Sequence, residues 1–526
     1  MDLVAISWRN YTNLFKQKKI YNTFNFMNIK LFRASALALI GLFACQNYDN
    51  TNSERAITPP PPLTADYQDV TIPTNIAPLN FRVVDATKVR ADIKIGDEVV
   101  ISTTGRKGLI DINPKKWSKM LCENAGKKMS IEVTAWNESH KKGIKYKPFD
   151  IYISTDSIDQ WLSYRLIEPG YEDWGKMGIY QRDISSFEEA IVIENTSKSE
   201  NSMNDYGCIN CHSFANFNAD CMLFHARSSG GGTVFYKDNE LRKVEFNKIG
   251  PNKKATYPQW NPSGRYVAFS SNSTNQTFYA EGNQPIEVFD TESDLILYDT
   301  KKGEVITDPR FMTKERWETY PAWSPDGKWL YLCSANGVES MPQQRRDVHY
   351  DIIRVAFDEE RGLLGEQVDT IYNSRIAGGS ASYPRVSPDG RYLMFTHSNF
   401  GTFPIWHNEA DLRVIELNSG QEVDCDIINS DLSDSYHSWS SSGRWVVFGS
   451  RRLDGRYTRL FIAHCSEDGK FGKPFLLPQE DPDHNVWRLK SYNIPEFTKT
   501  KITLPQDKVK ELLHGTGEDH RYNGVN

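Results

Sequence analysis

The sequence predicts a mainly β protein with a six-bladed C-terminal β-propeller, preceded by a small β-sandwich-like domain with one helix. The first observation is a motif that recurs four times in the second half of the chain. The second is an alternation of apolar and polar residues in the stretch before it, which is typical of half-buried strands. The third is size and composition: 526 residues, 39% of them hydrophobic, with 13 Trp, 25 Tyr and 26 Phe. Such a chain can form two or three globular domains with aromatic-rich β-sheets.

The recurring motif is Tyr-Pro-x-Trp/Val-Ser/Asn-Pro-Ser/Asp-Gly-Arg/Lys. Copies begin at Tyr257, Tyr320 and Tyr383, and a fourth copy without the prolines begins at Tyr436, so the starts are 63, 63 and 53 residues apart. Repeats with a period of a few tens of residues are typical of propellers and solenoids. Each copy supplies a strand, a turn in which proline fixes φ and glycine accepts positive φ, and further strand-like runs. That is the content of one four-stranded blade.

The stretch before the repeats predicts the smaller domain. Residues 129–135 and 91–95 alternate apolar with polar side chains, as strands with one buried face do. Between them, Asn113-Pro114 has the form of an N-cap followed by proline at the first helical position, and Gly126 follows as a stop. The buried face of this helix is expected to consist of Trp117, Met120 and Leu121.

The chain therefore divides into seven segments. They are residues 1–26, upstream of the real start at Met27; 27–44, a lipoprotein signal peptide; 45–64, a polar and proline-rich tether; 65–160, the sandwich-like domain; 161–204, an aromatic-rich connector; 205–500, the propeller; and 501–526, a polar tail. We expect the last blade to be closed by strands from residues 487–497 together with residues that precede Cys208.

The segment 27–44 has the architecture of an export signal. Lys30 and Arg33 supply positive charge, and an apolar stretch ends at Cys45. The residues Leu42-Phe43-Ala44-Cys45 resemble a bacterial lipobox. The resemblance implies that Cys45 is diacylated and holds the protein at a membrane. The expected location is the periplasmic or surface face of the outer membrane. The alternatives are an uncleaved anchor or an ordinary secretory signal.

The repeats resemble the WD40-like (PD40) repeat of TolB and related periplasmic propellers, over residues 205–500. The resemblance implies a propeller that works in the cell envelope. Similar propellers precede the catalytic domain of prolyl oligopeptidases, but no Gly-x-Ser-x-Gly elbow is found in this sequence, which excludes the peptidase interpretation. Because propellers host many functions, the partners of TolB itself are not transferred to this chain.

The segment Cys208-Ile209-Asn210-Cys211-His212 matches C-x-x-C-H, the attachment sequence of c-type haem. In this interpretation Cys208 and Cys211 each add to one vinyl group, and His212 is the proximal ligand of the haem iron. The arrangement resembles a group of bacterial lipoproteins in which C-x-N-C-H-S-F opens a TolB-like propeller. Two other interpretations stay open: a small structural disulfide between the two cysteines, or a contribution to a zinc site.

The motif also aligns with the repeat. Cys211-His212-Ser213-Phe214 corresponds to Tyr436-His437-Ser438-Trp439. We therefore expect it in the first blade, where inner strands converge. The candidate distal ligands of the iron are His225, Met222, Met203 and His437.

These observations predict an envelope-anchored haem c propeller lipoprotein that acts in electron transfer or haem-based sensing, with a redox or envelope protein as partner. The alternative is a non-enzymatic propeller that binds protein or envelope components, with Cys208 and Cys211 as a structural disulfide. Charged residues such as Glu409 and the pair Arg451-Arg452 could belong to a catalytic site, but they are expected on solvated loops. Whether the protein is an enzyme is therefore left open. The net charge of −6 gives no reason to expect nucleic acid as a partner.

Overall fold

The structure is a computed structural model of the chain. It describes residues 59–168, 177–194, 208–227, 231–246, 255–279, 284, 286–518 and 520–522. The predictions for the signal peptide, for Cys45 and for Met203 fall outside these ranges. Within the described ranges, no helix combines the length and the apolar character needed to cross a membrane.

The N-terminal domain is built on a mixed sheet with the strand order β1-β8-β6-β3-β4, in which β1 runs parallel to β8 and β7 pairs with β6. A separate two-stranded sheet joins β2 and β5. The elements are β1 (Val70–Ile72), β2 (Phe81–Arg82), β3 (Lys88–Ile95), β4 (Glu98–Arg106), β5 (Leu109–Ile110), α2 (Pro114–Glu123), β6 (Lys128–Trp136), β7 (Ile144–Lys145) and β8 (Phe149–Ile153).

The predicted elements of this domain are confirmed, but the sandwich is not. Strand β6 buries alternate residues from Met129 to Ala135, and α2 begins at Pro114 with the side chain of Asn113 as its cap. Trp117, Met120 and Leu121 are buried together. Two sheets of matching size do not form, because the helix and the short β2–β5 pair accompany one larger sheet. The domain is thus a mixed sheet with one helix.

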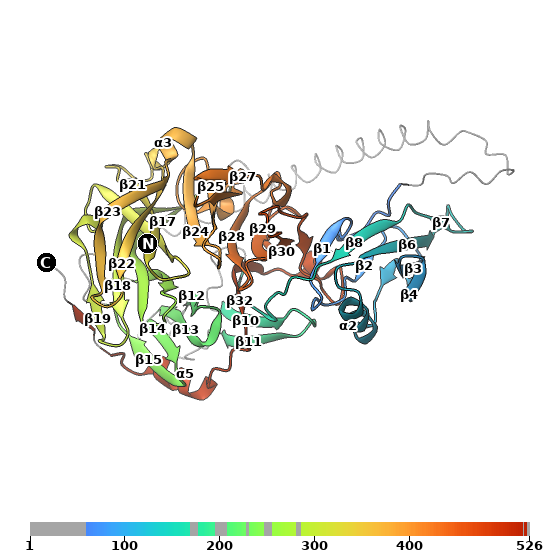
Figure 1. Cartoon of the computed structure of the whole chain (residues 1–526), viewed down its shortest axis with the longest axis horizontal. Helices are drawn as coiled ribbons and strands as arrows, with labels where there is room; N and C mark the ends of the chain where they lie inside the picture. The colour runs from blue at the N-terminus through green and yellow to red at the C-terminus, as the bar shows by residue number, and fades with distance from the viewer. Residues whose placement is uncertain are drawn as a thin grey trace, which may run out of the picture. The chain divides into compact units, whose positions relative to one another are not determined.

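Six sheets follow, each with four antiparallel strands and one of them extended by a fifth, parallel strand near the C-terminus, which is the architecture of a six-bladed propeller, as predicted. Five blades are made of strands consecutive in sequence (Figure 1). They are β12 (Cys208–Ala215), β13 (Asn218–Arg227), β14 (Gly232–Lys237) and β15 (Glu240–Val244); β16 (Thr256–Trp260), β17 (Tyr266–Phe278), β18 (Ile286–Asp299) and β19 (Glu304–Ile306); β20 (Arg316–Trp323), β21 (Trp329–Asn336), β22 (Asp351–Asp358) and β23 (Leu363–Tyr372); β24 (Ser380–Val386), β25 (Tyr392–Ser398), β26 (Asp411–Glu416) and β27 (Gln421–Val423); and β28 (Asp434–Trp439), β29 (Trp445–Ser450), β30 (Arg459–His464) and β31 (Phe475–Leu476).

The sixth blade closes the ring with strands from two distant parts of the chain. The late strand β32 (Ser491–Thr498) pairs with β9 (Trp161–Ile167), which continues to β10 (Gly178–Asp183) and β11 (Glu189–Glu194) (Figure 1). This confirms the expected closure. It also corrects the segment 161–204, whose described strands belong to a blade and are not a connector.

The six inner strands form a closed ring. Each contacts the next in the order β12, β16, β20, β24, β28 and β32, and β32 returns to β12. An axial channel therefore runs through the middle of the ring, lined by the first strand of every sequential blade and by β32.

The C-terminal segment, predicted as a polar tail, packs onto the propeller. Helix α5 (Gln506–His514) buries Val509 completely, and β33 (Arg521–Tyr522) pairs in parallel with β19. Ile502 and Leu504 join an apolar cluster with residues of the first blade. These contacts fix the tail to the rim of the propeller.

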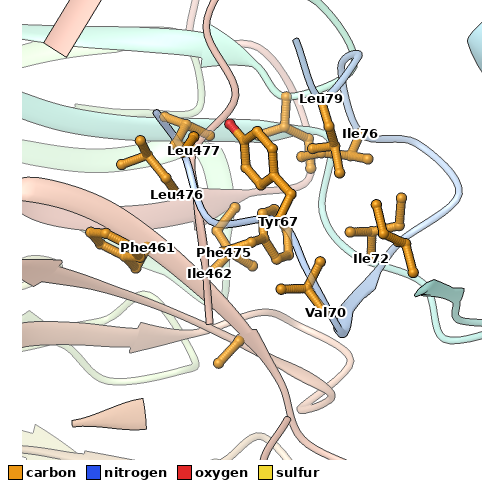
Figure 2. Packing of buried hydrophobic residues seen from close by; sticks show 14 of the residues in the cluster. Tyr67, Val70, Ile72, Ile76, Leu79, Phe461, Ile462, Phe475, Leu476 and Leu477 are labelled. Atoms are coloured by element: carbon orange, nitrogen blue, oxygen red, sulfur yellow. The ribbon is translucent and has the colours of Figure 1, made fainter. Parts of the chain in front are cut away.

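The N-terminal domain packs against the fifth blade. Tyr67, Val70 and Ile72 share one apolar cluster with Phe461 and Leu476 of that blade (Figure 2). Polar contacts accompany the cluster, including a hydrogen bond from Asn80 Nδ2 to the carbonyl of Glu480 at 2.9 Å. A contact face of this kind stabilises both partners through apolar burial.

Candidate axial site

The inner strand of every blade carries the same irregularity. Its pairing with the second strand of the blade, or with β9 in the sixth blade, shifts register across two residues. The bulged pairs are Cys211-His212, Tyr257-Pro258, Tyr320-Pro321, Tyr383-Pro384, Tyr436-His437 and Ile494-Pro495. The first residue of each pair has positive φ, between 45° and 52°. A bulge with its first residue in this region usually has glycine there, so five bulky residues and one cysteine hold a strained conformation around the axis.

Four of these first residues are tyrosines whose rings pack against one another in tilted pairs. The ring centroid of Tyr320 lies 4.5 Å from that of Tyr257 and 4.0 Å from that of Tyr383. Tyr383 in turn lies 4.5 Å from Tyr436, and its hydroxyl donates to that of Tyr436 at 3.0 Å. The tyrosines close the channel near its middle, with Cys211 and Ile494 at the two remaining positions.

The alignment of the Cys-His motif with the repeat is therefore confirmed. Cys211-His212 occupies the bulge that Tyr436-His437 occupies in the fifth blade. The side chain of His212 is fully buried, and its Nε2 lies 3.7 Å from Oε2 of Glu496 on β32. Burial, and next the charge of Arg165, lower the pKa of His212 to about 3, so the imidazole is neutral at ordinary pH.

The space beside His212 is small. Cys211, His212, His437, Arg385 and Glu496 line a central cavity of about 30 Å³. A cavity of this size holds about two water molecules, whereas sites for cofactors and drug-sized ligands enclose on the order of 300–1,000 Å³. The space beside His212 in this arrangement is thus smaller than a porphyrin.

The four candidate distal ligands are not gathered at one point. His437 lines the same central cavity as His212, and its Nε2 lies 3.0 Å from the carbonyl of Met394. Met222 is fully buried in an apolar cluster, and Nδ1 of His225 lies 2.9 Å from the hydroxyl of Thr233. Met203 lies outside the described residues. The structure thus brings together His212 and His437, and leaves Met222 and His225 on the next strand.

The structural-disulfide alternative is also absent from this arrangement. Cys211 is a free thiol, and Cys208 begins β12 opposite Arg227. Among the described residues, no group of three or more His, Cys, Asp or Glu side chains is placed to hold a metal ion. The motif therefore serves here as the inner strand of a blade.

Wider pockets open on both sides of the central cavity. Along β12, Asn210 lines the first of them, Cys211 and His212 line the centre, and Phe214 lines the second. The first, which we call the arginine pocket, encloses about 200 Å³, and the second about 320 Å³. The second is rimmed by aromatic rings of the repeat motif, Trp260, Trp323 and Trp439.

The arginine pocket combines aromatic walls with two guanidinium groups. Arg451 follows β29, is 3% exposed and lies over the ring of Trp406 with 3.6 Å between guanidinium carbon and ring centroid. Arg165, from β9, donates to Oδ1 of Asn493 at 2.6 Å. The Nε atoms of Arg451 and Arg165 are buried without a hydrogen-bond partner among the described residues.

The positive charge of Arg451 is compensated only in part. Burial lowers the pKa of Arg451 to about 10, with only partial compensation from Asp454. The carboxylate that lines the same pocket, Glu168, lies 4.0 Å from Nζ of Lys490. The pocket therefore presents positive charge and unpartnered N–H donors, a combination that favours an anion.

Sequence reasoning missed this pocket. It assigned Arg451 to a solvated loop because charged residues between strands are usually exposed. The structure buries it, since the loop folds over the end of the channel and against Trp406 of the short 3-10 turn Pro404–Trp406. The only sequence signal was the unusual pair Arg451-Arg452 directly after a strongly apolar strand.

No family model matches the chain. Among curated proteins, it is 26% identical over 228 residues to the uncharacterized protein Atu1656 of Agrobacterium fabrum, and the match covers 38% of this chain and 66% of that protein. The chain thus spans slightly less than two thirds of the length of this relative.

Several solved structures share general features of the architecture. They include an oligogalacturonate lyase from Vibrio parahaemolyticus (TM-score 0.30, 11% identity, 56% of this chain and 85% of that chain) and an oligogalacturonate lyase in complex with manganese (0.29, 11%, 77% and 100%). Prolyl endopeptidases are similar over 74% of this chain and 53% of theirs (0.31, 8%). TM-scores this low carry no argument about function. The propeller itself is established by the strand pairing: six four-stranded sheets around one axis.

Proposed function

We propose that this protein is an envelope-anchored binding protein, held at a membrane by acylated Cys45, whose propeller takes a small anionic ligand in the arginine pocket. The observation that carries the proposal is Arg451, a guanidinium that is 3% exposed and has an Nε without a partner among the described residues. A buried cation with free donors gains more from an anion than an exposed one does, because water does not compete for it.

The walls of the pocket indicate the class of ligand. Its volume of about 200 Å³ suits a molecule of metabolite size rather than a protein segment. Trp406, Phe403, Ile286 and Val288 offer apolar contact beside the guanidinium groups. A small carboxylate with an apolar or ring-shaped body matches both features.

The test is calorimetric titration of the protein with a panel of mono- and dicarboxylates. Arg451→Gln and Arg165→Gln are each expected to weaken binding roughly 10- to 100-fold, the size of a charge-assisted hydrogen bond. Arg361→Gln removes the same charge from an exposed position and is the matched control. Equal affinities in all four proteins would contradict the assignment of the ligand to this pocket.

The haem hypothesis remains a second candidate because the C-x-x-C-H match and the export signal support it. Its test is the visible spectrum, oxidised and dithionite-reduced, of protein made in cells that mature a control cytochrome c. A Soret band that survives acid–acetone extraction and disappears in Cys208→Ala and Cys211→Ala would establish covalent haem. A colourless protein would exclude it.

A further inference from the structure

An exposed apolar cluster lies at the short helix α4 (His484–Trp487), between the fifth and sixth blades. Val486, Trp487 and Leu489 are 70%, 75% and 62% exposed. Large apolar side chains with this exposure within four residues are unusual on a soluble surface and mark an interaction site. We call these three residues the apolar tip.

The apolar tip is held firmly in place. Arg488 lies within the same turn and donates to the carboxylate of Glu189 on β11 at 2.8 Å. Its guanidinium carbon also lies over the ring of Tyr492 on β32, 4.9 Å from the ring centroid. The exposure of the tip is therefore a property of a fixed turn, not of a loose loop end.

The tip is also linked to the start of the first described segment of the chain. Asp483, which precedes α4, accepts from Nε of Arg82 at 2.8 Å. Arg82 in turn accepts a backbone hydrogen bond from Thr64 at 3.0 Å. Thr64 lies five residues after Pro59, the first described residue, and Cys45 precedes Pro59 by 14 residues. Even fully extended, those 14 residues reach at most about 50 Å.

We infer that the apolar tip inserts into the interfacial layer of the lipid bilayer that holds the acylated chain. The inference rests on the proposed acylation of Cys45. The tether keeps the side of the protein at Pro59 within reach of the membrane, and the tip lies on that side. Tryptophan favours the region between headgroups and acyl chains, and valine and leucine favour the acyl boundary next to it.

Charge around the tip indicates how it binds. Glu480, Asp481 and Asp483 precede it, while Arg488 and Lys490 flank Leu489. Because acidic and basic groups are mixed, attraction to anionic headgroups contributes little. Insertion is driven by the apolar side chains, and it therefore depends weakly on salt and on the fraction of anionic lipid.

The test places the acylated full-length protein in phosphatidylcholine vesicles whose lipids are brominated near the top of the acyl chains, so that nearby tryptophans are quenched. We expect quenching in the wild type and its loss in Trp487→Phe, which keeps the apolar surface but removes the reporter. The matched control is Ile376→Ser, which removes an 86% exposed apolar side chain from another place on the propeller. It should leave the quenching unchanged.

A second measurement separates the tip from the anchor. The Cys45→Ser full-length protein is mixed with the same vesicles, and its bound fraction is measured by sedimentation at low and high salt. Its partition coefficient should fall roughly tenfold or more when Val486, Trp487 and Leu489 are all replaced by serine. Wild-type protein that stays on vesicles without quenching of Trp487 would overturn the inference and assign the tip to a protein partner, while leaving the anchor intact. Cys45→Ser protein that binds as tightly as wild type would refute the anchor but not the tip.

Discussion

Nε2 of His212 and Oε2 of Glu496 lie 3.7 Å apart at the centre of the propeller, too far for a hydrogen bond; the side chain of His212 is fully buried and that of Glu496 is 14% exposed. Burial raises the pKa of Glu496 to about 8 even though Arg385 and Gln259 oppose the shift. Burial also lowers the pKa of His212 to about 3. Both groups are therefore neutral at pH 7, and neither adds charge to the centre of the ring.

Glu496→Gln should remove a dependence of stability on pH. The folded-state pKa of Glu496, about 8, lies above the ordinary value of 4.5 for a glutamate. Between these values the folded protein keeps a proton that the unfolded chain releases, so unfolding becomes easier as pH rises from 4.5 to 8. The wild type is expected to lose ~3 kcal/mol relative to Glu496→Gln over this range. Denaturant unfolding of both proteins at pH 5 and pH 8 measures the gap. A gap that is equal at the two pH values would contradict the assignment.

A second buried cluster should lose stability in the same direction, as pH rises, but at a higher pH. Nε2 of His407 lies 3.1 Å from Glu287 and Nδ1 lies 3.3 Å from Glu409. Burial lowers the pKa of His407, but the two carboxylates outweigh it and raise the pKa to about 9. The imidazolium thus stabilises the fold below its unfolded pKa, and this contribution disappears as pH rises through 9.

The two carboxylates of this cluster should contribute unequally to the free energy of unfolding. Glu287 is 2% exposed and Glu409 is 39% exposed at the side chain. Glu287→Gln should lower the free energy of unfolding by about 3 kcal/mol, since it breaks a buried pair. Glu409→Gln should lower it by about 1 kcal/mol or less, because water screens the partner. Urea unfolding at pH 7 checks the order, and equal losses would argue against burial as the cause.

Arg451→Met should separate binding from stability. The buried guanidinium is costly, as its lowered pKa of about 10 indicates. Methionine keeps the apolar contact with Trp406 but has no charge to bury. The variant is expected to lose anion binding and to unfold at the same temperature as the wild type or higher, measured by differential scanning calorimetry without ligand. A drop of several degrees would show that the contact with Trp406 outweighs the burial of charge.

Thiol reactivity should report the burial of the Cys-His motif. Among the described cysteines, Cys122 is exposed, whereas Cys211, Cys221, Cys333, Cys425 and Cys465 are buried. Burial also raises the pKa of Cys221 to about 11. A maleimide should label Cys122 rapidly in the native protein and the other five only after denaturation. Mass spectrometry of the digest locates the label. Rapid native labelling of Cys211 would show that β12 leaves its blade.

Much of the fold was predictable because local and repeated signals agree. The four motif copies fix the blade content, and the alignment of Cys211-His212 with Tyr436-His437 predicted the position of β12. The cap at Asn113 and the alternation along β6 were also sufficient for α2 and its neighbouring strand. These features depend on backbone geometry and side-chain periodicity over a few residues.

The misses concern contacts between distant parts of the chain. The strands β9 to β11 carry no copy of the motif, so they looked like a connector until β32 paired with β9. The tail looked polar, yet Val509 is buried against the propeller. Arg451 looked like a surface charge, although it is 3% exposed. In each case the partner lies too far away in sequence for periodicity to reveal it.

The sequence by itself determined the repeat and the turn chemistry, because each depends on adjacent residues. Only the tertiary structure decided what lies on the axis. Closing six blades into a ring brings the bulges of all inner strands together, and the space left among them is set by packing rather than by any one motif. That packing leaves about 30 Å³ beside His212 and about 200 Å³ beside Arg451. Cys211-His212 is thus buried at the centre of the ring, whereas Arg451 lines the larger pocket beside it.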